Sequence, residues 1–69
     1  MSFLSMSFEA RKKLGEKVRV ARETKNLTQS MLASKVGQNN KLIASIERGD
    51  PVKFTKETIN AILDALEIA

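Results

Sequence analysis

The sequence contains no cysteine and no histidine in its 69 residues. It therefore forms no disulfide, no thiolate or imidazole metal site, no cysteine nucleophile and no histidine general base. No recognisable acid/base pair is formed by the carboxylates Glu47, Asp50, Asp64 and Glu67. We predict that the protein is not an enzyme and that it uses no cofactor and no metal.

Aromatic residues are also scarce, since the chain has three Phe and neither Trp nor Tyr. Proteins that read single-stranded RNA stack its bases on exposed aromatic side chains, so this scarcity argues against an RNA ligand. Three Gly and one Pro exclude a collagen-like or low-complexity chain and favour a folded domain.

Long apolar runs are absent, because charged residues occur throughout the chain. We expect no membrane-spanning segment. Residues 1–8 lack the basic beginning and apolar centre of a secretion signal, which predicts a cytoplasmic protein.

The charge of the chain is basic and unevenly distributed. The formal net charge is +4, and residues 1–36 hold eight Lys and Arg against three Glu. Such a balance points towards nucleic acid or another acidic surface. A length of 69 residues allows one small domain.

Four segments have the apolar spacing of amphipathic helices, and no segment alternates long enough to predict a strand. They are residues 8–25, 29–36, 39–48 and 55–66. We predict an all-α fold of four to five helices, in which residues 8–69 form the domain and residues 1–7 an apolar tail or arm.

Residues near the expected helix ends fit this division. The first helix could be capped by Ser5 or Ser7 and closed by a left-handed Asn26. Thr28 is a candidate cap for the second helix, whose inward side should include Met31, Leu32 and Val36. Thr55 should cap the fourth helix, with Phe54 packed against Ile59.

The segment from Gln29 to Arg48 has the spacing of two short helices that cross at a sharp turn. Such a pair needs a small residue where the helices touch, a glycine in the turn and apolar residues beneath both helices. Ala33, Gly37 and the set Val36, Ile43 and Ile46 meet these needs at one consistent spacing. The pattern is typical of a helix-turn-helix unit over residues 29–48.

With these motifs the sequence resembles the lambda-repressor-like, Cro-like helix-turn-helix proteins, also called the xenobiotic-response-element family. The resemblance is carried by Leu27-Thr28-Gln29, Leu32-Ala33, Val36-Gly37 and Ile43-x-x-Ile46-Glu47-Arg48-Gly49. It covers residues 10–66 and implies a lambda-repressor-like fold. It also implies a sequence-specific regulator of transcription that binds double-stranded DNA.

The inward positions of the third helix suggest which side chains meet the bases. Ile43 and Ile46 fix its inner side, so the 100° step per residue turns the opposite side outward. Recognition helices of this type reach base edges from their first turn and outer face. We therefore expect base contacts from Asn39, Asn40, Lys41, Ala44 and Ser45.

The resemblance implies that Gln29 touches a phosphate or braces a recognition side chain, and that Arg22 and Glu47 form an ion pair. We expect further phosphate contacts from residues within and beside the unit, namely Thr28, Lys35, Arg48 and Lys53. The run at residues 11–13 could clamp a phosphate or simply be solvated.

The expected partner is a palindromic DNA operator bound by a homodimer, at which the protein acts as a repressor. Two departures from the family stand out: Leu42 occupies a position where many relatives have Ser or Thr, and many relatives continue into a fifth, dimerising helix. The ending Ile62-Leu63-Asp64-Ala65-Leu66 is similar to that of short antitoxins. An alternative function is therefore an antitoxin that binds a toxin protein and represses its own operon.

Overall fold

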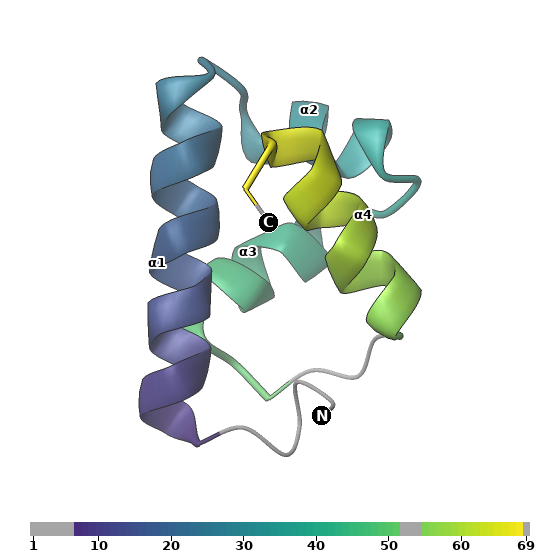
Figure 1. Cartoon of the computed structure of the whole chain (residues 1–69). Helices are drawn as coiled ribbons and strands as arrows, with labels where there is room; N and C mark the ends of the chain where they lie inside the picture. Colours follow the sequence, from purple (N-terminus) through teal and green to yellow (C-terminus); the bar gives the residue numbers. More distant parts are fainter. Residues whose placement is uncertain (1–6, 52–54, 69) are drawn as a thin grey trace.

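A computed structural model describes residues 7–51 and 55–68 of the chain. These residues form four helices, which Figure 1 shows in order: α1 (Phe8–Thr24), α2 (Gln29–Lys35), α3 (Asn40–Arg48) and α4 (Lys56–Leu66). The described residues contain no strand. The predicted all-α fold is confirmed, and the predicted helix bounds are correct to within one residue.

Each helix begins with a capping side chain. The side-chain oxygens of Ser7, Thr28, Asn39 and Thr55 each accept a hydrogen bond from a backbone N–H of the first turn. Four N–H groups at a helix start lack partners inside the helix, and a cap satisfies one of them. The sequence therefore sets where each helix begins.

The links between the first three helices depend on left-handed residues. Asn26 follows α1 with φ 58°, as the sequence predicted, and Gly37 follows α2 with φ 70°. Gly adopts positive φ at little cost because it has no Cβ. The chain therefore reverses between α2 and α3 within a few residues.

The core consists of one apolar cluster to which all four helices contribute. Its buried residues are Val18, Leu32, Ala33, Ile43, Ile46, Ile62 and Leu66. Met31 is an exception to the prediction for α2, since it is 48% exposed while its neighbour Leu32 is fully buried. A helix of seven residues turns only a narrow side inward, and Met31 lies beyond it.

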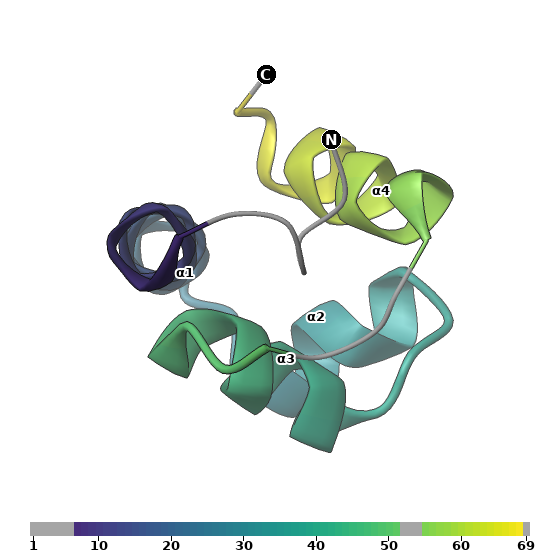
Figure 2. The same cartoon turned by 90° about the horizontal axis from the view of Figure 1, so that it is seen from below.

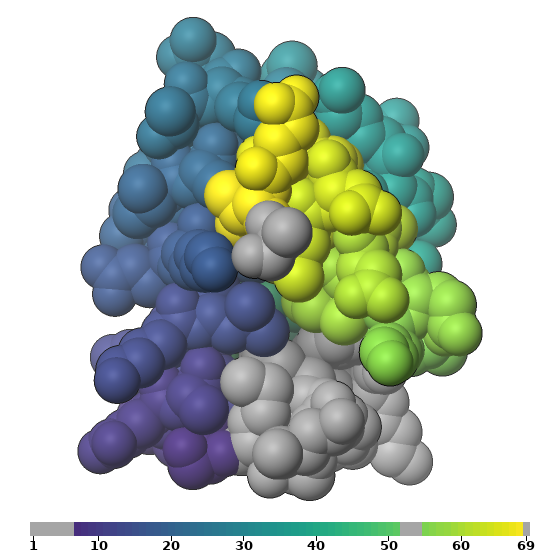
Figure 3. Space-filling view, viewed as in Figure 1, coloured from purple at the N-terminus to yellow at the C-terminus, as the bar shows by residue number. Residues whose placement is uncertain are grey.

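α1 packs across α3 and α4, and α2 also contacts both. Figure 2 looks along α1 and shows α3 and α4 on different sides of the molecule. Figure 3 shows the face that α1 and α4 form together. Where α1 meets the end of α4, Val20, Ala21, Leu66 and Ile68 help to line an apolar hollow of about 380 Å³.

Two expectations of the sequence fall on residues 52–54, outside the described part of the chain. These are the phosphate contact of Lys53 and the packing of Phe54 against Ile59. Within the described residues, no helix has both the length and the apolar character needed to cross a membrane.

Candidate nucleic-acid interface

The helix α3 separates an apolar inner side from a polar outer side. Ile43 and Ile46 are 0% exposed. Asn40 and Lys41 are exposed, while Ala44 and Ser45 are partly exposed. These four residues are four of the five expected base-contacting residues, and the fold leaves all four accessible.

Asn39, the fifth expected base-contacting residue, is exposed and also caps α3. Its Oδ1 accepts a hydrogen bond of 2.9 Å from the backbone N–H of Leu42. A side-chain amide oxygen has two lone pairs, so this cap uses part of what a bidentate contact with adenine would need. Leu42 itself is half-buried and packs against the core, which explains an apolar residue at that position.

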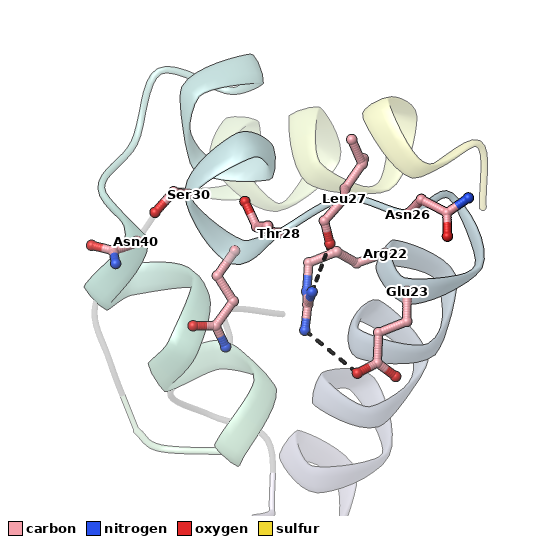
Figure 4. Close-up of a pocket in the computed structure, with 8 residues that line it drawn as sticks. Arg22, Glu23, Asn26, Leu27, Thr28, Ser30 and Asn40 are labelled. Carbon is pink, nitrogen blue, oxygen red and sulfur yellow. Dashed lines mark hydrogen bonds and ion pairs between the residues drawn. The ribbon is translucent and has the colours of Figure 1, made fainter.

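An open hollow of about 550 Å³ lies beside the beginning of α3 (Figure 4). One wall comes from the end of α1 and the following loop, and the other from the beginnings of α2 and α3. Its lining residues are Arg22, Glu23, Asn26, Leu27, Thr28, Gln29, Ser30 and Asn40. Two of the expected phosphate-contacting residues, Thr28 and Gln29, therefore lie near the exposed Asn40.

Ser30 also lines this hollow, although the sequence pattern did not predict it as a contact. It is exposed in the first turn of α2, next to Gln29, and its hydroxyl can donate to a phosphate. Its position in the sequence could have indicated this role, because side chains in the first turn of α2 lie beside backbone N–H groups that can bind a phosphate. Lys35, at the other end of α2, is exposed.

Arg22 and Glu47 form an ion pair that joins α1 to α3. Arg22 Nε lies 2.7 Å from Glu47 Oε2, and the two side chains are only 11% and 5% exposed. Arg22 Nη2 also donates to Glu47 Oε1, and Arg22 Nη1 donates to the carbonyl oxygen of Leu27. The hydrogen bond with Glu47 raises the pKa of Arg22, although partial burial opposes this effect. The guanidinium therefore remains charged at neutral pH.

Gln29 completes this arrangement from α2. Its Nε2 donates a 3.1 Å hydrogen bond to Glu47 Oε1, so the carboxylate is bound by side chains from two other helices. Gln29 therefore braces Glu47, which belongs to the ion pair with Arg22 and is not one of the expected base-contacting residues. One N–H of the same amide remains for a phosphate.

The end of α3 is fixed to α1 by Arg11, whose Nε donates a 2.9 Å hydrogen bond to the carbonyl oxygen of Gly49. The sequence offered only a phosphate clamp or a solvated charge for this residue. A third role applies, because the last carbonyl groups of a helix lack partners within it. The sequence pattern did not predict this contact between residues that lie 38 positions apart.

Arg48 extends along the outer side of α3 and meets Asp50. Arg48 Nε and Nη2 both donate to Asp50 Oδ2, at 3.0 and 2.8 Å, and Nη2 lies 3.3 Å from Ser45 Oγ. Arg48 is 63% and Asp50 41% exposed, so water screens this pair. The carboxylate at position 50 was not predicted to take part in the site.

Within the described ranges, no group of three or more His, Cys, Asp or Glu residues could hold a metal ion. The chemical groups of the interface are hydrogen-bond donors and acceptors, the cationic side chains of Lys and Arg, and backbone N–H groups. These are the groups with which proteins contact phosphates and base edges.

Comparison with known proteins agrees with this geometry. The chain matches the model of the helix-turn-helix family HTH_3 over residues 18–69. A search of curated proteins found no match.

Two solved structures are similar. The restriction-modification controller protein C.AhdI from Aeromonas hydrophila has a TM-score of 0.78 and 27% identity, with 90% of this chain and 88% of that chain covered. The clp gene regulator ClgR from Corynebacterium glutamicum has a TM-score of 0.75 and 25% identity, with 86% of this chain and 62% of that chain covered.

The buried inner side of α3, its polar outer side and the match over residues 18–69 lead to one conclusion: the chain belongs to the helix-turn-helix family, of the lambda-repressor-like or xenobiotic-response-element type.

Proposed function

We propose that the protein is a transcriptional regulator that binds double-stranded DNA in a sequence-specific manner, as a homodimer on a palindromic operator, and represses transcription there. The observation that carries this proposal is the fixed orientation of α3. Ile43 and Ile46 are fully buried, so Asn40 and Lys41 are held outward on an exposed helix of nine residues. The similarity to a controller protein and to a gene regulator supports the same function.

In this proposal the first turn and outer side of α3 enter the major groove. The amides of Asn39 and Asn40 suit adenine, Lys41 suits guanine, and the methyl group of Ala44 suits thymine. Ser45 can contact either kind of base. Phosphates on either side of the groove are bound by Thr28, Gln29 and Lys35, which belong to or cap α2.

Selection of bound sequences from a random duplex pool tests the proposal directly. We expect an enriched palindrome whose half-sites lie about 34 to 36 Å apart, which is one turn of DNA. Recovery of no enriched sequence would contradict sequence-specific binding. An enriched site without two-fold symmetry would contradict the homodimer.

Two lysine variants then separate base contacts from phosphate contacts. Lys41→Ala should lose about 1 to 3 kcal/mol of binding free energy and relax the preference at one base pair. Lys35→Ala should weaken binding to all sequences equally. Lys56→Ala, in the first turn of α4, is the matched control and should change neither.

Repression is tested by transcription in vitro from a promoter that contains the selected site. We expect the protein to reduce transcription, since a bound dimer would block polymerase. Purification from the native cells gives a second test. A larger protein from an adjacent gene that purifies with the chain would favour the antitoxin alternative.

A further inference from the structure

The carboxylate of Asp50 lies at the end of α3 on the side that the proposed function turns towards DNA. It accepts two hydrogen bonds from Arg48, while the guanidinium also lies 3.3 Å from the hydroxyl of Ser45. A negative charge at this place repels phosphates. Its presence therefore needs a reason other than affinity for the DNA backbone.

We infer that Asp50 is a specificity-determining residue, which holds Arg48 beside Ser45 so that these two side chains together read a guanine. This inference rests on the proposed function, because it assumes that the outer side of α3 lies in the major groove. It revises the expectation from the sequence that Arg48 contacts a phosphate.

The donors of Arg48 show how such a contact would form. A guanidinium has five N–H groups in a fixed plane. Asp50 takes the N–H of Nε and one N–H of Nη2, and Ser45 Oγ faces Nη2 as well. The two N–H groups of Nη1 have no hydrogen-bond partner among the described residues, so they are available to a ligand.

The hydroxyl of Ser45 supplies the second donor. Because its oxygen accepts from Arg48, its own hydrogen remains available to another acceptor. Ser45 and Arg48 thus present two neighbouring donors from one face of α3. Guanine is the base that shows two neighbouring acceptors, N7 and O6, in the major groove.

The alternative is a phosphate contact, and the neighbours of Arg48 argue against it. A guanidinium that serves a phosphate gains from having no competing anion, whereas Asp50 binds two of its donors. The pair is exposed and contributes little to folding stability. The effect of Asp50 that remains is to orient the guanidinium of Arg48, and this orientation matters most when the guanidinium reads a base.

The test compares four variants with the wild-type full chain on the selected operator and on duplexes with each base pair changed in turn. The variants are Asp50→Ala, Arg48→Lys, Ser45→Ala and Asp64→Ala. The last removes an exposed carboxylate from α4 and is the matched control for the change of charge. Thermal melting of each variant verifies folding, and the backbone N–H of Asp50 keeps its hydrogen bond to Ser45 O when the side chain is removed.

We expect the wild type to prefer one guanine per half-site by roughly tenfold over other bases, within the range of a good bidentate contact. Asp50→Ala and Arg48→Lys should each reduce this preference, because each removes the oriented arginine fork, and Ser45→Ala should reduce it as well. All other positions of the site should keep their preferences. Asp64→Ala should leave every base preference unchanged.

An equal gain of affinity for all sequences in Asp50→Ala, with the guanine preference intact, would overturn the inference. Such a result would make Asp50 a surface charge only, and it would leave the proposed function standing because the wild type still selects its site. A uniform loss of affinity in Arg48→Lys would also overturn it, in favour of a phosphate contact. Failure of the wild type to select any sequence would overturn the proposed function as well.

Discussion

Gly15 lies in the middle of α1, at a place where every residue type except proline would favour the helix more than glycine does. It is buried, and a Cβ at this position would lie 2.7 Å from the carbonyl oxygen of Glu47 and still closer to that of Ile46. α1 therefore approaches the backbone of α3 as closely as it does because this side chain is missing. Gly15 therefore sets the distance between α1 and α3.

Gly15→Ala should therefore destabilise the protein, although alanine is the better helix former by about 1 kcal/mol. We expect a loss of about 1 to 3 kcal/mol, because the obstacle is backbone that cannot rotate away. Urea denaturation measures it. Gly37→Ala is the comparison, since its Cβ would meet nothing within 4 Å and only its positive φ opposes the change. A Gly15→Ala variant more stable than the wild type would show that α1 and α3 can separate without cost.

The pair of Arg22 and Glu47 leads to a second prediction. Arg22→Met and Glu47→Leu should each cost about 3 kcal/mol, because each leaves a nearly buried charge without its partner. The double variant should lose less than the sum of the two, as a thermodynamic cycle would show. A domain of this size has only about 3 to 5 kcal/mol of stability, so unfolding should be followed at low temperature.

A control variant and the pH dependence of the ion pair complete this experiment. Glu16→Gln, which removes an exposed partner of Arg19 at 3.7 Å, should change stability by less than about 0.5 kcal/mol. The sign of the raised pKa of Arg22 means that the stabilisation is complete at neutral pH and is lost only in strongly alkaline solution. Additive losses in the double variant would contradict direct coupling.

At the scale of the helix, short elements depend on their ends. α2 and α3 have seven and nine residues, and isolated helices of that length are unstable in water. Their instability is offset by packing against the core and by the capping side chains of Thr28 and Asn39. In the proposed function the cap of α3 would affect both folding and DNA recognition, because Asn39 is also an expected base contact.

Substitutions at Asn39 separate the two roles. Asn39→Ala should cost about 0.5 to 2 kcal/mol of folding stability by removal of the cap. Asn39→Asp should keep that stability, since Asp caps equally well, yet weaken DNA binding because it places a negative charge near phosphates. Thermal melting and fluorescence anisotropy with labelled operator measure the two effects. Unchanged DNA affinity in Asn39→Asp would remove this residue from the interface.

The helices and the helix-turn-helix unit were predictable because they depend on local patterns. Caps such as Thr28 and Thr55 and the apolar spacing of Ile43 and Ile46 are visible in a single sequence. The contacts of Gly15 and Arg11 were not, because they depend on how two helices lie in space. From the sequence, a glycine inside a helix indicates only that the helix is less stable at that position. The close approach of Gly15 to α3 becomes visible only in the folded structure.

The site shows the same division. The exposure of Asn40 and Lys41 could be predicted because Ile43 and Ile46 define the inner side of α3, and the helical step per residue then turns the first two residues outward. The link between Asp50 and Arg48 lies just beyond the helix end, where the periodicity no longer applies. Met31 was misplaced because one apolar residue in a seven-residue helix carries little information about its direction.

At the scale of the whole molecule, the affinity of the protein for DNA should depend strongly on the salt concentration. A dimer that contacts six or more phosphates should lose roughly a thousandfold in affinity between about 50 and 200 mM salt. Titration of labelled operator over that range gives the slope of log K against log salt. Lys35→Ala should make the slope shallower by about one unit per subunit, and Lys17→Ala, beside the apolar hollow of α1 and α4, should leave it unchanged. An affinity that hardly varied with salt would rule out the expected phosphate contacts.

The exposed residues Asn40 and Lys41 form none of the side-chain hydrogen bonds or ion pairs that the structure gives for the described residues. In contrast, Glu47 of α3 and Gly49, which follows α3, both bind side chains of α1. Sequence drift at the first two positions would thus leave the scaffold intact. In the proposed function, a few substitutions at Asn40 and Lys41 would change the target site, whereas substitutions at Glu47, Gly15 or Arg22 would disturb the packing of α3 on α1.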